Sequence, residues 1–463
     1  MLGGIVLEVQ IKKLSENVDS NICYMPNDIF NLFKLSKEIL YKFHLGQSHE
    51  YSYITPMVEQ DKCMYFSNSV FKKLLLFEGV TLNIWKNGDE IYLGPVVGIF
   101  VKSKSTAALR IGKHSFFIQK HAEAGSKTNC LSYFYSIEGI NWDEGKIKGY
   151  TFVQNLNEWR YDWFPMPDVI YDRGVHFNEY QKPYVKYMRE QFRANNVHFI
   201  NSPRYFNKWK VYECLSKYPD VSIYLPKTII YRSFSDVLSM LNEYEFIFVK
   251  ASSGSLGKQV LSIEQIDKKY KLNFNKHGLK EIIFKEIEDV KMFVEKFVKE
   301  RQFVVQQGIR LLKYNGRNMD LRVLLIKVRQ GKWEAVRHHC RIAQKNYTIT
   351  NCSLGADWIN YEKVYPYLSS PFCKRSIPDK EELVNTTKKI LYYYEKEFGS
   401  FGELGMDMAV DIYGDIWFIE ANTKPDKLSR PGLYDPKKIP PQAINIFEYA
   451  KFLASNERKM YTS

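Results

Sequence analysis

The chain of 463 residues carries 66 Lys and Arg against 52 Asp and Glu, a formal net charge of +14, and 45% of its residues are hydrophobic. At about 150 residues per domain this length predicts roughly three domains, and the hydrophobic content excludes a disordered chain. No uncharged apolar run approaches the ~20 residues that cross a bilayer. The opening residues lack a basic leader and a cleavage site, so we expect a cytoplasmic protein without a membrane span.

The basic residues and the cysteines exclude two further classes of protein. Lys and Arg are spread along the whole chain, often in alternating charged runs that are typical of solvated helix faces. The sequence shows no RNP-like strand, zinc finger or recognition helix, so we expect no nucleic-acid partner. The seven cysteines are scattered without a CxxC pair, which indicates reduced buried thiols instead of a disulfide framework or a zinc site.

Three regions of different patterning follow one another. Residues 1–92 alternate apolar and polar positions between short turn signals, which predicts a small β-rich domain. In residues 93–200 strand and helix patterns alternate, as in a parallel α/β layer. Residues 201–455 form one α+β unit, followed by a tail at 456–463, and no internal repeat is expected anywhere. Helices of this unit are expected at 207–217, 234–242, 287–300 and 380–399.

The strongest chemical signal is the segment GELGMDMAVDIYGDIWFIEANTKP. It predicts two strands around a two-residue turn at Tyr413-Gly414, a register that places Asp407 directly opposite Glu420. Two carboxylates ~5 Å apart repel by about 3 kcal/mol at an effective dielectric of about 20, and a divalent cation between them turns this repulsion into binding. Asn422 shares the face of Glu420, which completes an oxygen set suited to Mg²⁺. An ordinary hairpin with solvated acids is the alternative.

A second signal is the segment FIFVKASSGSLGKQV, in which an apolar strand ends in Lys250 and leads into a Gly-rich loop. Gly and Ser allow backbone N–H groups to approach phosphate oxygens closely, and the lysine supplies a positive charge. The loop is not a Walker A motif, and a flexible hairpin is the alternative interpretation. The candidate residues of this segment are Lys250, Ser252, Ser253, Gly254, Ser255 and Gly257.

The run VVQQGI is expected to form a hinge at the edge of a strand, where backbone N–H and C=O groups can meet the edge of an adenine. Its candidate residues are Gln306, Gln307, Gly308 and Ile309. Elsewhere, Lys208 lies in the first turn of an expected helix, where the positive end of the helix dipole disfavours it. A nearby anion explains that position better, although the signal is weak alone.

Two arginines complete the candidate site. Asp320 and Arg322 begin an expected strand, Arg341 begins another segment, and Asn351 follows in a loop. A guanidinium has the planar fork that grips a phosphate or an acyl-phosphate. For each arginine alone, a surface salt bridge is the alternative.

The order of these pieces resembles the ATP-grasp superfamily, the fold of glutathione synthetases and D-alanine–D-alanine ligases, and most closely the endospore coat-associated YheC/YheD family. The resemblance rests on GPVVGIF, SPRYFNKWKVYECL, VKASSGSLGKQV, VVQQGIRLLKYNGRNMDLRV and LGMDMAVDIYGDIWFIEANTKP, and covers residues 92–455. It implies a multidomain α+β and α/β protein: an ATP-grasp fold of two α+β lobes, preceded by an α/β domain and a small β-rich N-terminal domain.

The resemblance also implies roles for the candidate residues. It places Lys208, Lys250 and the loop at 252–257 on the phosphates of ATP, and the hinge from Gln306 to Ile309 around adenine. Asp407, Glu420 and Asn422 would hold one or two Mg²⁺ ions. The hinge departs from the family pattern, because it has two glutamines where many members place a ribose-binding glutamate.

The remaining implied roles concern the reaction. Arg322, Arg341 and Asn351 would stabilise the transferred phosphoryl group or acyl-phosphate, and Lys424 matches the position that faces the acceptor. The implied reaction is attack of a carboxylate on the γ-phosphate of ATP, followed by capture of the acyl-phosphate by an amine.

We therefore expect an ATP- and Mg²⁺-dependent ligase whose carboxylate and amine substrates are small molecules or peptides. The family implies an association with the spore and spore-coat proteins as partners. One alternative is a nucleotide-binding but catalytically degenerate structural or regulatory protein of the spore, against which the complete metal set argues. An ATP-dependent phosphotransferase is the other.

Overall fold

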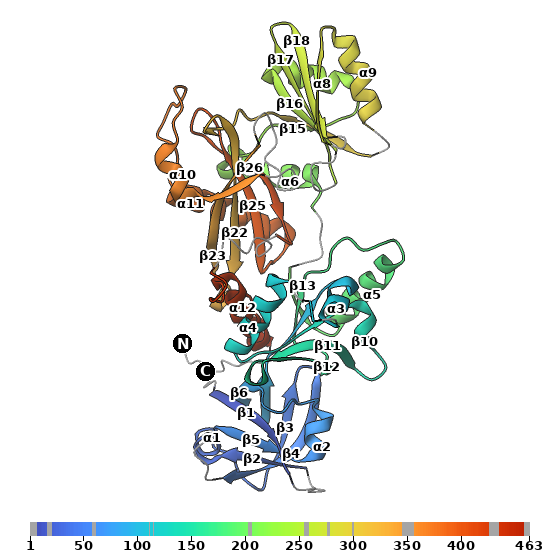
Figure 1. Ribbon diagram of the computed structural model, residues 1–463, viewed down its shortest axis with the longest axis vertical. Coiled ribbons are helices and arrows are strands. Elements are labelled where there is room, and N and C mark those ends of the chain that lie inside the picture. The colour runs from blue at the N-terminus through green and yellow to red at the C-terminus, as the bar shows by residue number, and fades with distance from the viewer. Residues whose placement is uncertain are drawn as a thin grey trace. The chain divides into compact units, whose positions relative to one another are not determined.

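The computed structural model describes residues 7–15, 21–57, 62–110, 112–113, 115–201, 206–253, 259–275, 278–298, 301–344, 356–425 and 435–457. The chain forms two compact units (Figure 1). The first comprises Met1–Ser202, Ile326–Glu334 and Asp426–Ser463, and the second comprises Pro203–Leu325 and Ala335–Pro425. The domains expected from the sequence are divided differently, because residues 326–334 and 426–455 are expected in the domain at 201–455. The expected domain boundaries stay a prediction.

The first unit begins with a closed barrel of seven strands in the order β1-β5-β2-β4-β3-β7-β6. Every second side chain points into the barrel, so that Ile11, Phe43 and Ile84 are fully buried. The elements are β1 Leu7–Lys13, β2 Ile22–Pro26, α1 Asn27–Leu32, β3 Leu40–Leu45, β4 Ser48–Met57, β5 Cys63–Phe66, α2 Asn68–Lys73, β6 Thr81–Asn87 and β7 Glu90–Gly94.

The barrel contains an internal repeat, so the expectation that the chain has none is wrong. The order β2-α1-β3-β4 recurs as β5-α2-β6-β7. Each helix is followed by a left-handed residue, Lys34 with φ 52° and Leu75 with φ 55°. The next residue, Leu35 or Leu76, then donates its N–H to the carbonyl five positions earlier, at 3.1 and 3.0 Å. The two copies therefore share backbone conformation where few identical side chains remain.

A mostly parallel sheet follows the barrel in the first unit. Its order is β10-β11-β9-β8-β13-β14, with β12 paired to β11, and β9, β8, β13 and β14 run parallel to one another. The alternation of strands and helices expected here is confirmed. The elements are β8 Val96–Phe100, α3 Ser103–Arg110, α4 Phe116–Lys127, β9 Leu131–Tyr135, β10 Ile140–Asn141, β11 Lys146–Val153, β12 Glu158–Pro165, β13 Val169–Asp172, α5 Gln181–Ala194, β14 His198–Ile200 and α12 Pro441–Glu457.

The first lobe of the second unit is a six-stranded antiparallel sheet in the order β15-β20-β16-β17-β18-β19 (Figure 1). Helices α8 and α9 bury Val237, Leu241 and Val294 against it because these side chains recur at helical spacing. The elements are α6 Lys208–Leu215, α7 Pro219–Ser222, β15 Thr228–Ile230, α8 Phe234–Tyr244, β16 Phe246–Ala251, β17 Val260–Ile266, β18 Lys269–Asn275, β19 Leu279–Phe284, α9 Ile287–Phe297 and β20 Phe303–Gln307.

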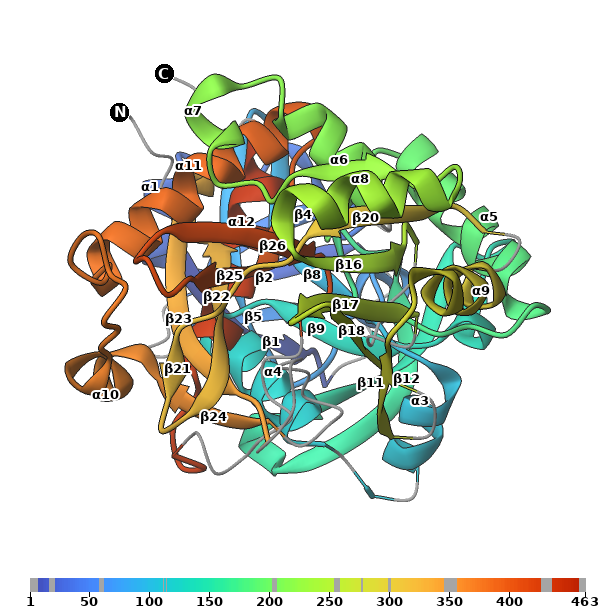
Figure 2. The same ribbon diagram turned by 90° about the horizontal axis from the view of Figure 1, so that it is seen from above.

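The second lobe is a sheet in the order β24-β23-β22-β25-β26, with β21 paired to β22 (Figure 2). Its long helix α11 begins where the Asp379 side chain accepts from the Glu382 N–H at 2.8 Å, and it ends at Gly399. The elements are β21 Lys313–Tyr314, β22 Arg317–Lys327, β23 Trp333–Ile342, β24 Asp357–Asn360, α10 Tyr361–Val364, α11 Lys380–Phe398, β25 Glu403–Val410 and β26 Ile416–Asn422. The four helices expected in this unit are confirmed as α6, α8, α9 and α11.

The chain passes from the first lobe to the second directly after β20. The Leu312 N–H donates to the Val410 carbonyl at 2.8 Å, and the Ile412 N–H donates to the Arg310 carbonyl at 2.9 Å. These two bonds fasten the connecting segment to the end of β25, so the hinge and the acidic hairpin are positioned together.

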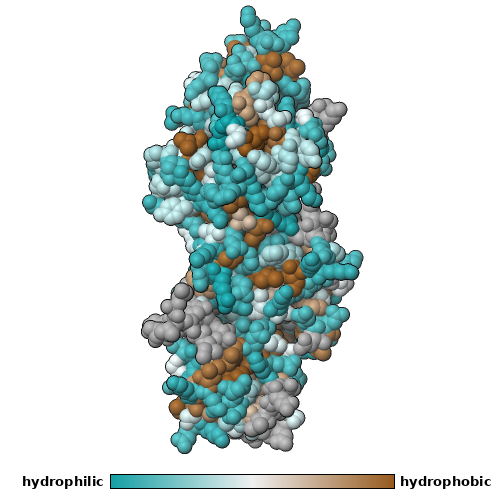
Figure 3. Space-filling model, turned by 90° about the vertical axis from the view of Figure 1, so that its left-hand side faces the viewer, coloured by the Kyte–Doolittle hydropathy of each residue, from teal (hydrophilic) through white to brown (hydrophobic). Residues whose placement is uncertain are grey.

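The face shown in Figure 3 is mostly hydrophilic and carries separate hydrophobic patches. Within the described residues, none of the helices has the length and apolar character needed to span a bilayer.

Candidate functional site

The last hairpin pairs its acids as the sequence predicts. Asp407 on β25 lies opposite Glu420 on β26, and Gly405 lies opposite Asn422. Since side chains two residues apart share a face of a strand, Asp407, Glu420 and Asn422 gather on one side of this hairpin.

Two local irregularities produce this register. At the turn the Asp411 N–H donates to the Asp415 carbonyl at 3.0 Å, so the loop has three residues and the expected two-residue turn is wrong. The last loop residue, Gly414, has φ 91°, which residues with a Cβ rarely adopt. A β-bulge follows Asp407, where Ile419 has no partner strand residue, and this extra residue cancels the one-residue shift made by the turn.

The carboxylate of Asp407 is almost fully buried, with 2% exposure, and is held by two arginines. Arg322 grips both of its oxygens, through Nε to Oδ1 and through Nη2 to Oδ2 at 3.0 Å. Arg341 adds a third contact, from Nη2 to Oδ2 at 3.0 Å. Burial alone would raise the pKa of Asp407, but the two guanidinium groups outweigh burial and hold this pKa below its usual value.

Arg341 is itself shared between two acids. It is buried on β23, and its guanidinium forms a bidentate pair with Asp320 on β22, with Nε 2.7 Å from Oδ1. Asp320 and Arg322 lie two residues apart on the same strand face. The alternative of a surface salt bridge is therefore wrong for both arginines, which instead belong to a buried cluster of two positive and two negative charges.

Lys208 and Lys250 approach the hairpin acids from the first lobe. The Nζ of Lys208 lies 4.0 Å from Oε2 of Glu420, and both side chains are partly exposed. Burial and, to a smaller extent, the charge of Lys208 lower the pKa of Lys250 to about 8, while Glu420 opposes this shift. Lys208, Lys250 and Glu420 lie on separate segments and interact electrostatically. A site that binds both an anion and a cation needs such a group of charges.

The partner of Lys250 is neutral. Its Nζ donates to Oε1 of Gln306 at 2.7 Å and lies 4.4 Å from the ring centre of Phe248. The amide nitrogen of Gln306 donates in turn to the Thr228 hydroxyl at 2.9 Å. Because Gln306 carries no charge, the ammonium group of Lys250 is oriented but not neutralised by it.

The start of α6 is tied to the beginning of the glycine loop. Asn207 caps this helix by accepting from the Lys210 N–H at 3.1 Å. The Lys208 N–H donates to the Ser252 carbonyl at 2.8 Å, and the Asn207 side chain donates to the Ser252 hydroxyl at 3.2 Å. Ser252 is buried and Ser253 is exposed. The hydrogen bonds explain how the lysine of α6 is positioned; contacts of both serines with phosphate stay predictions.

The hinge differs from the expectation in one respect. Strand β20 pairs with β15 on one side and with β16 on the other, so it is an internal strand and the expected strand edge is wrong. The N–H groups of Gln307 and Gly308 already donate to backbone carbonyls, at 2.8 and 2.7 Å. The N–H of Ile309 donates to no carbonyl in the described part of the chain, which makes it the better candidate donor to an adenine.

Gly308 is required by close packing. A Cβ at this position would overlap the ring of Phe246 and lie 2.7 Å from the Phe246 carbonyl oxygen. The hinge can therefore follow β16 closely only because residue 308 has no side chain.

For five other candidate residues the structure gives no contact that tests the expected role. Lys424 lies just beyond β26 and is half-buried, and its contact with an acceptor stays a prediction. Gly254, Ser255, Gly257 and Asn351 lie outside the described residues, and so do their expected roles.

The hairpin acids fit Mg²⁺ as part of a shared site. Asp407, Glu420 and Asn422 supply carboxylate and amide oxygens, which this ion prefers. The side-chain nitrogen of Asn422 is buried and has no partner within the described structure. Such an atom costs about 1–3 kcal/mol, a cost expected where an amide faces a ligand. In the same part of the chain no three His, Cys, Asp or Glu gather as a metal cage.

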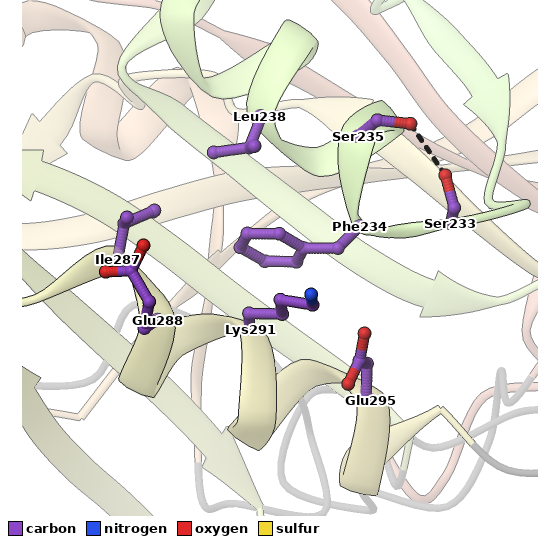
Figure 4. Close-up of a pocket in the computed structure, with 8 residues that line it drawn as sticks. All are labelled: Ser233, Phe234, Ser235, Leu238, Ile287, Glu288, Lys291 and Glu295. Carbon is purple, nitrogen blue, oxygen red and sulfur yellow. Dashed lines mark hydrogen bonds between the residues drawn. The ribbon is translucent and has the colours of Figure 1, made fainter.

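A cavity of about 400 Å³ lies elsewhere, between α8 and α9 (Figure 4). Phe234, Leu238 and Ile287 supply its apolar lining, and Lys291 and Glu295 lie toward one end. None of the candidate residues lines this cavity, so we assign it no part in the site.

Comparisons with known proteins identify relatives of this chain. A family model described as YheC/D-like ATP-grasp matches residues 196–453. The endospore coat-associated protein YheD of Bacillus subtilis (strain 168) is 26% identical over 403 residues, covering 85% of this chain and 86% of that protein. YheC of the same organism is 22% identical over 295 residues, covering 63% of this chain and 79% of that protein.

Among solved structures, D-alanyl-alanine synthetase A from Vibrio cholerae O1 biovar eltor str. N16961 is similar, with a TM-score of 0.44 and 14% identity. The match covers 79% of this chain and 98% of that one. This likeness is too distant to support a statement about activity.

Proposed function

Because the chain belongs to the YheC/D-like ATP-grasp family, we propose that it is an ATP- and Mg²⁺-dependent ligase that joins a carboxylate to an amine through an acyl-phosphate. The observation that supports this most is the convergence of opposite charges on the last hairpin. Lys208 approaches Glu420 from the first lobe, while Arg322 and Arg341 meet Asp407 in the second. Phosphoryl transfer depends mainly on positioning and charge neutralisation, which such an arrangement supplies.

Each group of residues has a distinct proposed task. Lys208 and Lys250 neutralise the phosphates of ATP, and the ammonium group of Lys250 is already oriented by the Gln306 amide. Asp407, Glu420 and Asn422 hold Mg²⁺, which when bound neutralises phosphate charge. Arg322 and Arg341 stabilise the charge on the transferred phosphoryl group, since a guanidinium matches its oxygens in a bidentate manner.

The proposed location rests on the names of the curated relatives. The two curated relatives are named endospore coat-associated proteins. We accordingly propose a cytoplasmic protein that associates with the spore, with spore-coat proteins as partners. Its carboxylate and amine substrates are small molecules or peptides, and Lys424 is proposed to face the acceptor.

The direct test is ADP release by the purified full chain with Mg²⁺ and ATP, screened against pairs of carboxylates and amines. A ligase gives ADP release that requires both substrates and yields an amide product. A stable phosphorylated product would instead indicate a phosphotransferase, and nucleotide binding without turnover would indicate a degenerate protein. Glu420→Gln should lower the release by about 10²–10³-fold, whereas the matched variant Glu264→Gln, on β17 beside Arg310, should retain it.

A further inference from the structure

We infer that Arg322 is a specificity-determining residue that makes the site accept Mg²⁺ together with nucleotide phosphates and exclude the free cation. Arg322 occupies the carboxylate of Asp407, and it leaves that carboxylate only when phosphate oxygens offer it an equivalent partner. This inference rests on the proposed function and concerns how the same site loads its ligands.

The first step is that guanidinium groups already contact both carboxylate oxygens of Asp407. Arg322 contacts both of its oxygens and Arg341 contacts one of them, and the residue is 2% exposed. A cation can coordinate Asp407 only after a guanidinium has moved away, because the contacts already surround the carboxylate.

The second step identifies Arg322 as the group that moves. Arg341 is held from two sides, since Asp320 grips it in a bidentate pair in addition to Asp407. Arg322 has Asp407 as its acidic partner among the described residues, and its side chain is 12% exposed. Residue 405 is a glycine, and a Cβ there would lie only 3.1 Å from Cδ of Arg322. The missing side chain therefore leaves space beside this arginine.

The third step is the charge of the site. Among the described residues, the four groups Lys208, Lys250, Arg322 and Arg341 carry one more charge than the three acids that they act on, Asp320, Asp407 and Glu420. A free divalent cation is therefore repelled, whereas a metal–nucleotide complex carries a net negative charge and is attracted.

The fourth step concerns the ligands left for a free cation. With Asp407 occupied, only Glu420 and the Asn422 amide remain of the hairpin set, and Glu420 already lies 4.0 Å from Lys208. Water would have to fill the other positions around a free Mg²⁺ ion, so the protein contributes little to its binding. A phosphate group supplies further oxygens and at the same time a bidentate partner for Arg322.

The experiment uses Mn²⁺ as a spectroscopic substitute for Mg²⁺ and measures its binding to the full chain by electron paramagnetic resonance, with and without a non-hydrolysable ATP analogue. The wild-type chain should bind Mn²⁺ only with the analogue present. Arg322→Gln should bind Mn²⁺ alone more tightly than the wild type by about tenfold or more. Adding Asp407→Asn to that variant should remove the gain, which locates the bound ion.

Two further variants control for charge and for folding. Arg310→Gln makes the same change of charge beside Glu245 and Glu264, outside the site, and should bind Mn²⁺ as the wild type does. Arg322→Lys keeps the charge but lacks the planar fork, so it should show part of the gain even if Arg322→Gln folds poorly. Equal affinity of the wild type and both Arg322 variants for free Mn²⁺ would overturn the inference while leaving the ligase proposal standing. A wild-type chain that fails to bind the analogue with Mn²⁺ would overturn both.

Discussion

In the first lobe Lys250 meets a neutral partner, whereas in the second lobe Arg322 and Arg341 pair with acids. Lys250 donates to the amide of Gln306, and Lys208 lies 4.0 Å from its nearest described carboxylate. Arg322 and Arg341 instead contact Asp407 at 3.0 Å. Gln306 orients Lys250 without neutralising its charge, while each of the two arginines contacts a buried acid.

The largest expected effect comes from breaking the internal pairing of the second lobe. Asp320→Asn leaves Arg341 buried with half of its acidic partners, and removal of one member of a buried pair costs about 3–5 kcal/mol. Urea unfolding should show this loss. The matched variant Asp357→Asn, whose carboxylate is 57% exposed beside Arg317, should lose at most about 1 kcal/mol. Similar losses in the two variants would mean that the cluster does not stabilise the lobe.

The second prediction removes an acid of the hairpin without disturbing the buried cluster. Glu420→Gln should lower turnover by about 10²–10³-fold, the usual cost of a group that acts on the transition-state charge. Its free energy of unfolding should change by less than about 1 kcal/mol, because its pair with Lys208 is long and half-exposed. Wild-type turnover in this variant would remove Glu420 from the metal site.

Asp407 is a less informative position for that test. Substituting it leaves Arg322 without its acidic partner and Arg341 with Asp320 alone. The variant should therefore lose stability as well as activity, so a loss of turnover at Asp407 does not by itself identify a metal ligand.

The third prediction concerns the hinge between the lobes. Gly308→Ala should destabilise the protein by about 1–3 kcal/mol, the usual cost of overpacking, because the added Cβ meets the ring and the carbonyl of Phe246. Thermal unfolding measures this effect. An unchanged melting temperature would mean that the hinge tolerates more separation from β16 than its packing suggests.

The smallest expected effect is a dependence on pH in the first lobe. The pKa of Lys250 is lowered to about 8, so nucleotide affinity should weaken as the pH rises through 8 and the ammonium group loses its proton. Since the unfolded chain keeps that proton up to about pH 10.5, the free energy of unfolding should rise over the same window. Gln306→Glu would give Lys250 an acidic partner and should move the loss of affinity to higher pH. A titration of the nucleotide dissociation constant between pH 7 and pH 10 decides this.

The sequence predicted the helices and the opposed acids because these depend on local patterns. The pairing of Asp407 with Glu420 is confirmed, yet it arises from a three-residue loop and a bulge whose shifts cancel. Neither irregularity has a strong signal in the residues. The expectation was therefore correct for a reason that differs from the one on which it rested.

Features that depend on long-range pairing were not predicted. The role of Asp320 requires β22 and β23 to be neighbours, which no local pattern reveals, although its spacing from Arg322 places both on one strand face. The hinge was expected at an edge because the three-residue strand β15, which covers it, is too short to recognise. The repeat in the barrel has no clear signal in the sequence because the two copies share backbone conformation more than residue identity.

The repeat in the barrel limits which parts of the N-terminal region can fold on their own. In the barrel, β5 of the second copy is inserted between β1 and β2, and β7 lies next to β3 of the first copy. A single copy would leave strand edges unpaired on both sides, and unpaired edges seek another chain. The two copies therefore complete each other as the halves of an interleaved dimer would, and a fragment that ends between them should associate with itself or aggregate instead of folding alone.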